Sequence, residues 1–280
     1  MNVMIRPGNE QELLSMLREL PEYHIVNGGT VLMIRYKNGF LNQAPFICIN
    51  ELKELKGITR EGNRISIGGA VTHAEVMRSQ VIREYYPELV AACTEVGSWQ
   101  IRTTGTLAGN IVNSSPAGDT LPPLMAGNAE LELVCSEAAR EVAFDDFFTG
   151  PGTNSLKKGE FLRRVFLPAE KGRGVFFKMG QRRALAISKV SLAVRITARY
   201  SICAGAVSKT PLLAKKTAEH LDRCGEKVSF KQLREACDII GRECAPITDV
   251  RSTAEYRQKM IANLLEEALK KLGVSGSENL

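Results

Sequence analysis

Short apolar runs that are typical of β-strands alternate with amphipathic helical patterns along most of the chain. A helix is predicted after Asn9, because Glu12 follows three positions on, as in a capping box, and leucines recur at helical spacing up to Leu20. The apolar runs 23–26 and 64–67 have the length and composition of strands instead. The chain is therefore expected to fold as a mixed helix and sheet protein.

The length and composition favour two domains, each with its own core. The chain has 280 residues, 44% of them hydrophobic, and its formal net charge of +6 is spread along the sequence rather than gathered in a tail. Such a surface gives little support to nucleic-acid binding, and no apolar run approaches the length of a membrane span. We expect neither a nucleic acid nor a membrane as a partner.

The seven cysteines are an odd number without a Cys-x-x-Cys pair, which argues against a disulfide framework. The first residues also lack the charged and apolar regions of a signal peptide, so we expect reduced thiols in a cytoplasmic protein. The three histidines are far apart and have no carboxylate or cysteine grouping near them. Neither a metal site nor a catalytic side chain is predicted.

The carboxyl-terminal part repeats the mixture of strands and helices after a linker predicted at 171–174. Strands are expected at 175–179, 191–200 and 202–207, followed by helices that begin at Thr217 and Thr253. The last helix carries eight apolar residues on one stripe between Tyr256 and Leu272, which indicates a face that packs on a core.

One glycine turn has the character of an anion-binding loop. Residues 27–30 read Asn-Gly-Gly-Thr and lie between the apolar run 23–26 and a second, mostly apolar stretch. Two glycines let the backbone approach a ligand closely, and N–H groups at a helix start favour negative charge. Taken alone, the same residues also fit an ordinary strand-to-helix turn.

A second polar stretch covers residues 100–119 and is rich in Thr, Gly, Asn and Ser. We expect a long functional loop here, with Trp99 beside it packed in the core. Its hydroxyls, amides and Asn110 suit phosphate oxygens, and Asp119 suits sugar hydroxyls. Two such loops suggest a pyrophosphate between them, although neither fits the dinucleotide or the nucleoside-triphosphate loop signature.

These stretches resemble those of the FAD-binding subunits of molybdenum hydroxylases, the flavoprotein family of xanthine dehydrogenase and carbon monoxide dehydrogenase. Residues 27–30 are similar to its Ala-Gly-Gly-Thr loop, and 100–119 to its Gln-Ile-Arg…Gly-Gly-Asn…Ser-Pro-x-x-Asp loop. Further matches are the segments 67–73, 147–152 and 177–182, together with Glu160 and Leu162. The resemblance extends from the amino terminus to about the last helix.

The resemblance implies an α+β fold with a two-subdomain FAD-binding domain of the vanillyl-alcohol-oxidase/PCMH type. This domain would span residues 1–170, with subdomains at about 1–57 and 58–170 and FAD extended between them. Residues 175–280 would form a smaller α+β domain, like the carboxyl-terminal domain of the carbon monoxide dehydrogenase flavoprotein.

Carried over position by position, the resemblance also implies cofactor-binding residues. The first loop would wrap the pyrophosphate and the neighbouring ribityl chain, the second would close on them, Asp119 would hold a sugar hydroxyl, and the remaining positions would contact flavin or adenine. The implied residues are Ile25, Val26, Asn27, Gly28, Gly29, Thr30, Val31, Leu32, Thr106, Gly109, Asn110, Val112, Asp119, Leu162 and Lys178.

The chain departs from the family pattern at several positions. Ala108 stands where relatives usually have glycine, Thr103 where they have Asn, and Asn27 where Ala is common, while the span 195–205 is shorter than usual. A methyl group at Ala108 would crowd the cofactor unless the backbone there has an ordinary conformation.

The implied function is electron transfer by an FAD-binding subunit of a heteromeric molybdenum hydroxylase. Molybdopterin and the iron–sulfur clusters would reside on partners, a large and a small subunit, because no segment of this chain suits either group, and the acceptor would be a molecule such as NAD. Two alternatives remain open: a self-sufficient flavin oxidoreductase of the PCMH type, and a scaffold or assembly module of the same fold without a cofactor.

Overall fold

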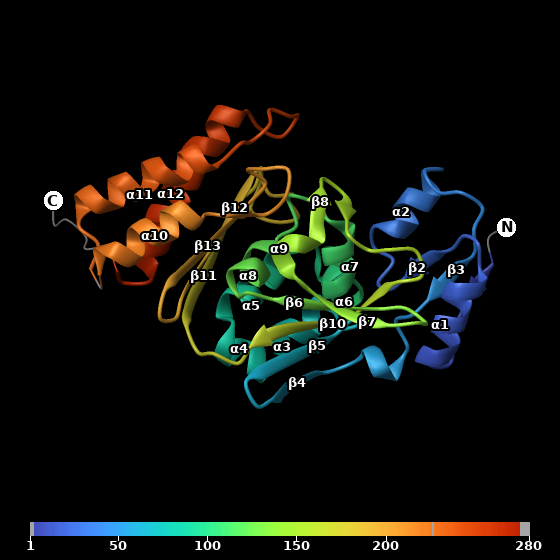
Figure 1. Cartoon of the computed structure of the whole chain (residues 1–280). Helices are drawn as coiled ribbons and strands as arrows, with labels where there is room; N and C mark the ends of the chain where they lie inside the picture. Colours follow the sequence, from blue (N-terminus) through green and yellow to red (C-terminus); the bar gives the residue numbers. More distant parts are fainter. Residues whose placement is uncertain (1–2, 226, 275–280) are drawn as a thin grey trace.

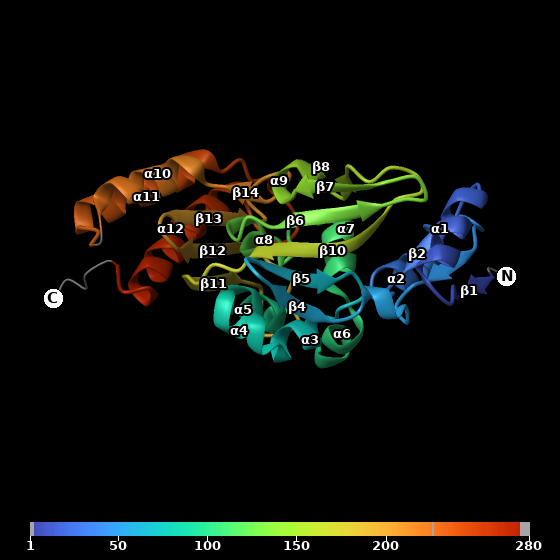
Figure 2. The same ribbon diagram turned by 60° about the horizontal axis from the view of Figure 1, so that its bottom comes forward.

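The computed structural model describes residues 3–225 and 227–274, which fold into three sheet-containing units arranged in chain order (Figure 1). The blue amino-terminal unit and the orange-red carboxyl-terminal helices lie at opposite ends of the molecule, with the green and yellow unit between them (Figures 1 and 2). Helices and strands are mixed throughout, which confirms the α+β fold. No helix among the described residues is long and apolar enough to cross a bilayer.

The first unit is a three-stranded parallel sheet with the order β1-β3-β2. The helix predicted after Asn9 is present, and the Asn9 side chain accepts a hydrogen bond from the N–H of Glu12. Its inward face places Leu13 and Leu17 on a small core with Ile47. The elements are β1 (Met4–Ile5), α1 (Glu10–Glu19), β2 (His24–Val26), α2 (Leu32–Lys37), β3 (Phe46–Cys48) and η1 (Lys53–Leu55).

The second unit is a five-stranded antiparallel sheet with the order β4-β5-β10-β6-β7. Its helices share one hydrophobic core with the sheet. The sheet strands are β4 (Ile58–Glu61), β5 (Arg64–Gly68), β6 (Glu130–Val134), β7 (Ala139–Ala143) and β10 (Phe161–Pro168). The remaining elements are α3 (His73–Arg78), α4 (Gln80–Tyr85), α5 (Pro87–Glu95), α6 (Trp99–Thr104), α7 (Leu107–Asn113), α8 (Leu121–Ala126), α9 (Phe144–Phe147), β8 (Phe148–Gly150) and β9 (Thr153–Asn154).

The expectation of a long loop over residues 100–119 is wrong, because much of this stretch is helical. Ser98 and Thr106 cap the short helices α6 and α7 by accepting hydrogen bonds from backbone N–H groups three residues on. Leu107 and Ile111 are fully buried, so α7 packs into the core despite its polar composition. Caps supplied by Ser and Thr explain why a polar stretch can begin two helices.

The third unit is an antiparallel sheet, β11-β12-β13-β14, covered by three helices. Helices were predicted only from Thr217 and Thr253, and the additional helix α11 has a capping box at Ser229 and Gln232. The proposed linker at 171–174 is also wrong in part, since β11 already begins at Arg173. The elements are β11 (Arg173–Met179), β12 (Val190–Ile196), β13 (Tyr200–Gly205), β14 (Leu212–Leu213), α10 (Lys215–Cys224), α11 (Phe230–Glu243) and α12 (Ala254–Lys271).

A buried ion pair joins the second and third units. Arg195 of β12 lies 2.8 Å from the carboxylate of Glu88 in α5, and its guanidinium stacks over the ring of Tyr86. Neither charged side chain is more than 4% exposed. A side chain at Gly174 would overlap the Glu88 carboxylate, so the strand can approach α5 only because this residue is glycine.

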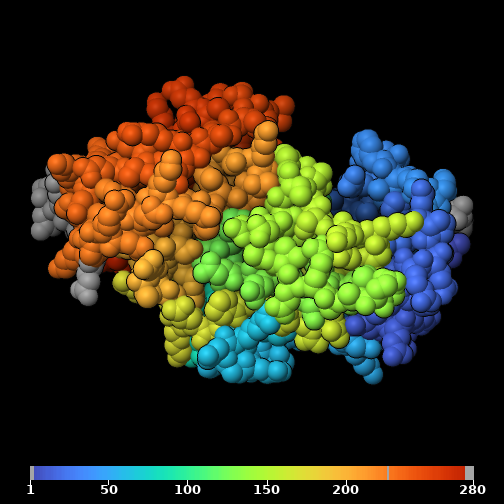
Figure 3. All heavy atoms as spheres, viewed as in Figure 1, coloured from blue at the N-terminus to red at the C-terminus, as the bar shows by residue number. Residues whose placement is uncertain are grey.

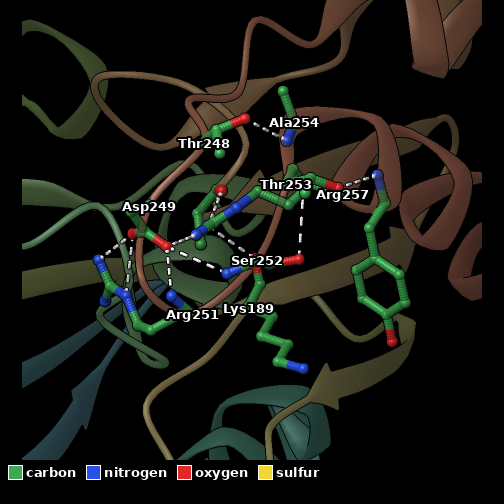
Figure 4. A network of polar contacts seen from close by, with 10 residues as sticks. Lys189, Thr248, Asp249, Arg251, Ser252, Thr253, Ala254 and Arg257 are labelled. Atoms are coloured by element: carbon green, nitrogen blue, oxygen red, sulfur yellow. Dashed lines mark hydrogen bonds and ion pairs between the residues drawn. The ribbon is translucent and has the colours of Figure 1, made fainter.

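A polar network around the buried Arg257 fixes the start of α12 (Figure 4). Asp249 accepts hydrogen bonds from Arg251 and from the buried Arg257, which also donates to the carbonyl oxygens of Lys189 and Ala206. Burial opposes ionisation of Asp249, but these donors keep its pKa below the ordinary value. The network ties the last helix to both ends of the β12–β13 hairpin.

Candidate cofactor-binding site

A cavity of about 320 Å³ lies where the first and second units meet. It is lined by β2 and the loop after it, by α7, and by the start of β10. The surface is hollowed between the blue residues of the first unit and the yellow-green residues of the second (Figure 3). Its volume falls within the range of small-molecule sites in proteins.

The loop after β2 presents a row of free backbone donors to this cavity. The N–H groups of residues 28 to 32 have no hydrogen-bond partner within the part of the chain that the structure describes. Gly29 has a φ of 69°, which turns the chain into α2. Such consecutive donors need an acceptor with several oxygens, and a phosphate or pyrophosphate provides it.

Gly28 allows the two predicted loops to touch. A Cβ at this position would overlap the carbonyl oxygen of Thr104 and lie 2.7 Å from the Cα of Gly105. Any larger residue would push the loop after β2 away from the end of α6. The glycine is therefore required by the close packing of the cavity wall as well as by the turn.

The first turn of α7 forms the opposite wall. Thr106 caps the helix through the N–H of Gly109, and Asn110 accepts a hydrogen bond from Thr120 through its Oδ1. No described residue accepts from the Nδ2 group of Asn110, which leaves a donor for a ligand. Ala108 is in the helix with an ordinary negative φ, so its methyl group causes no backbone strain.

Two polar groups in the wall were not predicted. His73 is 2% exposed, and burial, with a smaller effect of Arg102, lowers its pKa to about 4, so the imidazole is neutral at physiological pH. Glu160 is held by two hydrogen bonds from Arg140, the main reason that its pKa is lowered. The cavity therefore has both a neutral ring and a neutralised carboxylate.

Asp119 and Lys178 lie outside the cavity lining and contact each other. The Lys178 ammonium is 2.6 Å from Oδ2 of Asp119, and the Ser188 hydroxyl is 2.5 Å from its Oδ1. Lys178 also donates to the carbonyl oxygen of Glu95 at the end of α5. Burial raises the pKa of Asp119 although the lysine opposes this. The pair connects the end of the predicted loop to the third unit.

The expectation that Trp99 packs in the core is wrong. Its side chain is 55% exposed at the start of α6, and the Arg78 guanidinium lies 5.8 Å from the ring centre. No residue of α6 is buried, so this short helix lies at the surface and Trp99 lies there with it.

Twelve of the implied site residues come together in the cavity wall, whereas Val26, Asp119 and Lys178 do not line it. Those in the wall are Ile25, Asn27, Gly28, Gly29, Thr30, Val31, Leu32, Thr106, Gly109, Asn110, Val112 and Leu162. The other lining residues are mostly apolar; six of them lie in segments that carry the resemblance, and the rest come from elements that no motif marks. These other lining residues are Arg35, Ile49, His73, Val96, Ile101, Gly105, Ala108, Asn113, Leu156, Glu160 and Phe161.

The cavity fits an extended cofactor with a phosphate centre and flat rings. Its lining includes residues whose backbone N–H groups have no partner in the described part of the chain, and apolar side chains such as Ile49, Val96 and Phe161 that are suited to ring contact. No group of three or more His, Cys, Asp or Glu side chains that could hold a metal occurs among the described residues.

Two family models match the chain. The model described as the FAD binding domain in molybdopterin dehydrogenase matches residues 1–170, and the carbon monoxide dehydrogenase flavoprotein carboxyl-terminal domain matches residues 175–272.

Similar proteins cover nearly the whole chain. The glyceraldehyde dehydrogenase medium chain of Sulfolobus acidocaldarius is 26% identical over 96% of this chain and 97% of its own. The nicotinate dehydrogenase FAD-subunit of Eubacterium barkeri is 28% identical over 91% and 89%. The structure of reconstituted carbon monoxide dehydrogenase from Oligotropha carboxidovorans superposes with a TM-score of 0.91 at 25% identity, covering 96% of each chain.

Proposed function

The chain belongs to the FAD-binding medium subunits of the molybdenum hydroxylase family, and we propose that it carries electrons from iron–sulfur clusters on a partner to an acceptor such as NAD. Bound FAD supplies the redox chemistry, since its ring accepts and releases electrons singly or as hydride. The chain itself binds the cofactor, orients it and limits its contact with water.

The observation that carries this proposal is the row of free N–H groups from Gly28 to Leu32 in the cavity wall. These groups would hold the pyrophosphate, because consecutive N–H groups at a helix start can donate to its oxygens. Thr106, Gly109 and Asn110 would close on it from α7, while Val112 and Leu162 would contact the rings.

Val26, Asp119 and Lys178 would act from positions beside the cavity. Val26 is buried beneath the first loop and would support its shape. The two oxygens of Asp119 each have one donor, and a carboxylate can accept further bonds. We propose that Asp119 accepts from a sugar hydroxyl of FAD while Lys178 stays paired with it.

The partners would be a molybdopterin-binding large subunit and an iron–sulfur small subunit. The names of the relatives support this, since "medium chain" and "FAD-subunit" describe parts of larger assemblies. The seven free cysteines support a location in the reducing cytoplasm.

The first test is the absorption spectrum of the purified chain, with any released cofactor identified by mass. We expect a flavin spectrum with FAD released, or a colourless chain whose melting temperature rises on addition of FAD. A chain that neither carries FAD nor gains stability from it would contradict the proposal. Electron transfer is then tested by adding the two partner subunits and following NAD reduction at the expense of a hydroxylase substrate.

A further inference from the structure

The cavity wall contains two polar groups whose hydrogen-bonding capacity is left over in this structure. They are the amide of Asn27 and the imidazole of His73, and both line the cavity. Asn27 and His73 are far apart in the sequence, but the segments that carry them both approach Gly105. A Cβ on Gly105 would lie 3.3 Å from Thr30 Oγ1 and 3.5 Å from His73 Cδ2.

The Asn27 side chain is fixed at one end and free at the other. Its Nδ2 donates to the carbonyl oxygen of Gly69 at 2.7 Å, which joins the first loop to the turn after β5. Its Oδ1 is buried and has no partner among the described residues. An amide oxygen buried without a donor costs about 1–3 kcal/mol, so this atom favours a ligand that supplies an O–H or N–H group.

The His73 ring is also fixed on one side only. Its Nδ1 lies 3.7 Å from the Cys93 thiol, and burial keeps that thiol protonated by raising its pKa. With the S–H as donor to Nδ1, the ring proton is assigned to Nε2. No residue in the described ranges hydrogen-bonds Nε2, and the neighbouring Cδ2 faces Gly105 of the cavity wall.

We propose that Asn27 and His73 recognise hydroxyl groups of the cofactor, with Asn27 Oδ1 accepting from a hydroxyl and His73 Nε2–H donating to a hydroxyl oxygen. The inference rests on the proposed FAD site and assigns roles within it. A hydroxyl suits both atoms because it donates and accepts, whereas a phosphate at physiological pH cannot donate to Asn27. In FAD the hydroxyls belong to the ribityl chain or to the ribose.

The test compares FAD binding by the full chain and by the variants Asn27→Ala and His73→Leu, using the change in flavin fluorescence on titration. Each variant is expected to weaken FAD binding by roughly five- to tenfold, the size expected for one lost hydrogen bond. His220→Leu is the matched control, because His220 lies on α10, and it is expected to bind FAD like the parent.

Two fragments of the cofactor identify which hydroxyls are involved. If Asn27→Ala weakens FMN but not ADP, Asn27 accepts from the ribityl chain, and the reverse result assigns it to the ribose. Unchanged FAD affinity in both variants, within twofold, would overturn the inference while leaving FAD binding by the parent intact. If one variant does not fold, the other decides alone, and failure of the parent to bind FAD would refute the proposed function instead.

Discussion

Single residues determine the packing and the charge of the cavity wall. Gly28 lies where two segments of backbone nearly touch, and a methyl group there overlaps main-chain atoms that cannot rotate away. His73 is buried as a neutral ring in a position where a charged ring would be unfavourable. Each residue leads to a quantitative prediction.

Gly28→Ala is expected to lower the free energy of unfolding by about 1–3 kcal/mol and FAD affinity by at least roughly tenfold, because the loop must shift to accommodate the methyl group. The measurements are urea unfolding and FAD titration. Gly241→Ala is the control, since its Cβ would meet nothing within 4 Å in helix α11. This change should raise stability by about 0.5–1 kcal/mol, and equal effects at the two glycines would contradict the packing argument.

His73 makes stability depend on pH. The pKa of His73 in the folded chain, about 4, is below the value of about 6.5 expected in the unfolded chain. The neutral ring therefore contributes fully to the free energy of unfolding above pH 6.5, and this contribution falls as the pH approaches 4. Between pH 7 and pH 5 the parent should lose about 2 kcal/mol through this residue. Urea unfolding should show that the free energy of unfolding of His73→Leu changes less between pH 7 and pH 5, by about this amount. A pH dependence equal to that of the parent would refute the assignment.

Among the helices, a capping residue fixes the start of α7, which forms part of the cavity wall. Thr106 caps α7 within the site, and Thr253 caps α12 far along the chain by the same kind of bond to a backbone N–H. Replacing either threonine by Ala is expected to lower stability by about 1 kcal/mol. Only Thr106→Ala should also weaken FAD binding, which titration and thermal melting measure side by side. Equal FAD affinity in the two variants would show that the cap has no role at the site.

The same caps show what sequence reasoning could and could not predict. The Asn9 cap precedes a regular helical pattern, and this helix forms where it is expected. The stretch 100–119 has too few apolar residues for a recognisable period, so its helices were predicted as loop. They form because each is capped and because Leu107 and Ile111 find a core made by distant elements.

The same distinction, between local patterns and contacts with distant elements, applies to the residues of the site. The glycine loop and the polar stretch 100–119 are local motifs, and the sequence predicts their polar chemistry, although it does not predict that Leu107–Asn113 form helix α7. His73, Glu160 and Val96 enter the cavity wall from three other elements, and only their arrangement in space brings them together. The exposure of Trp99 likewise follows from the position of α6, which has no buried residue, in spite of the usual tendency of Trp to be buried.

At the scale of the whole molecule, one buried ion pair couples the flavin domain to the carboxyl-terminal domain. Glu88→Gln leaves Arg195 buried without a counter-charge and is expected to lower stability by about 3–5 kcal/mol. Calorimetry should show one transition for the parent and separate transitions for the variant.

The exposed pair of Glu84 and Lys171 provides the control for this prediction, since their side chains are 42% and 66% exposed. Glu84→Gln should change stability by less than about 1 kcal/mol. A single transition in Glu88→Gln, with the stability of the parent, would show that other contacts join the domains.

The exposed position of helix α2 bears on how readily the protein is degraded in the cell. None of its residues is buried, and the N–H groups of the five residues from Gly28 to Leu32 have no acceptor among the residues that the structure describes. A helix of this length has little stability of its own, so FAD bound at the proposed site would hold α2 in place more firmly than the chain alone does. Cellular proteases cleave segments that open most often. We therefore expect the abundance of this subunit to follow the supply of its riboflavin-derived cofactor, with cleavage of cofactor-free chains beginning at this helix.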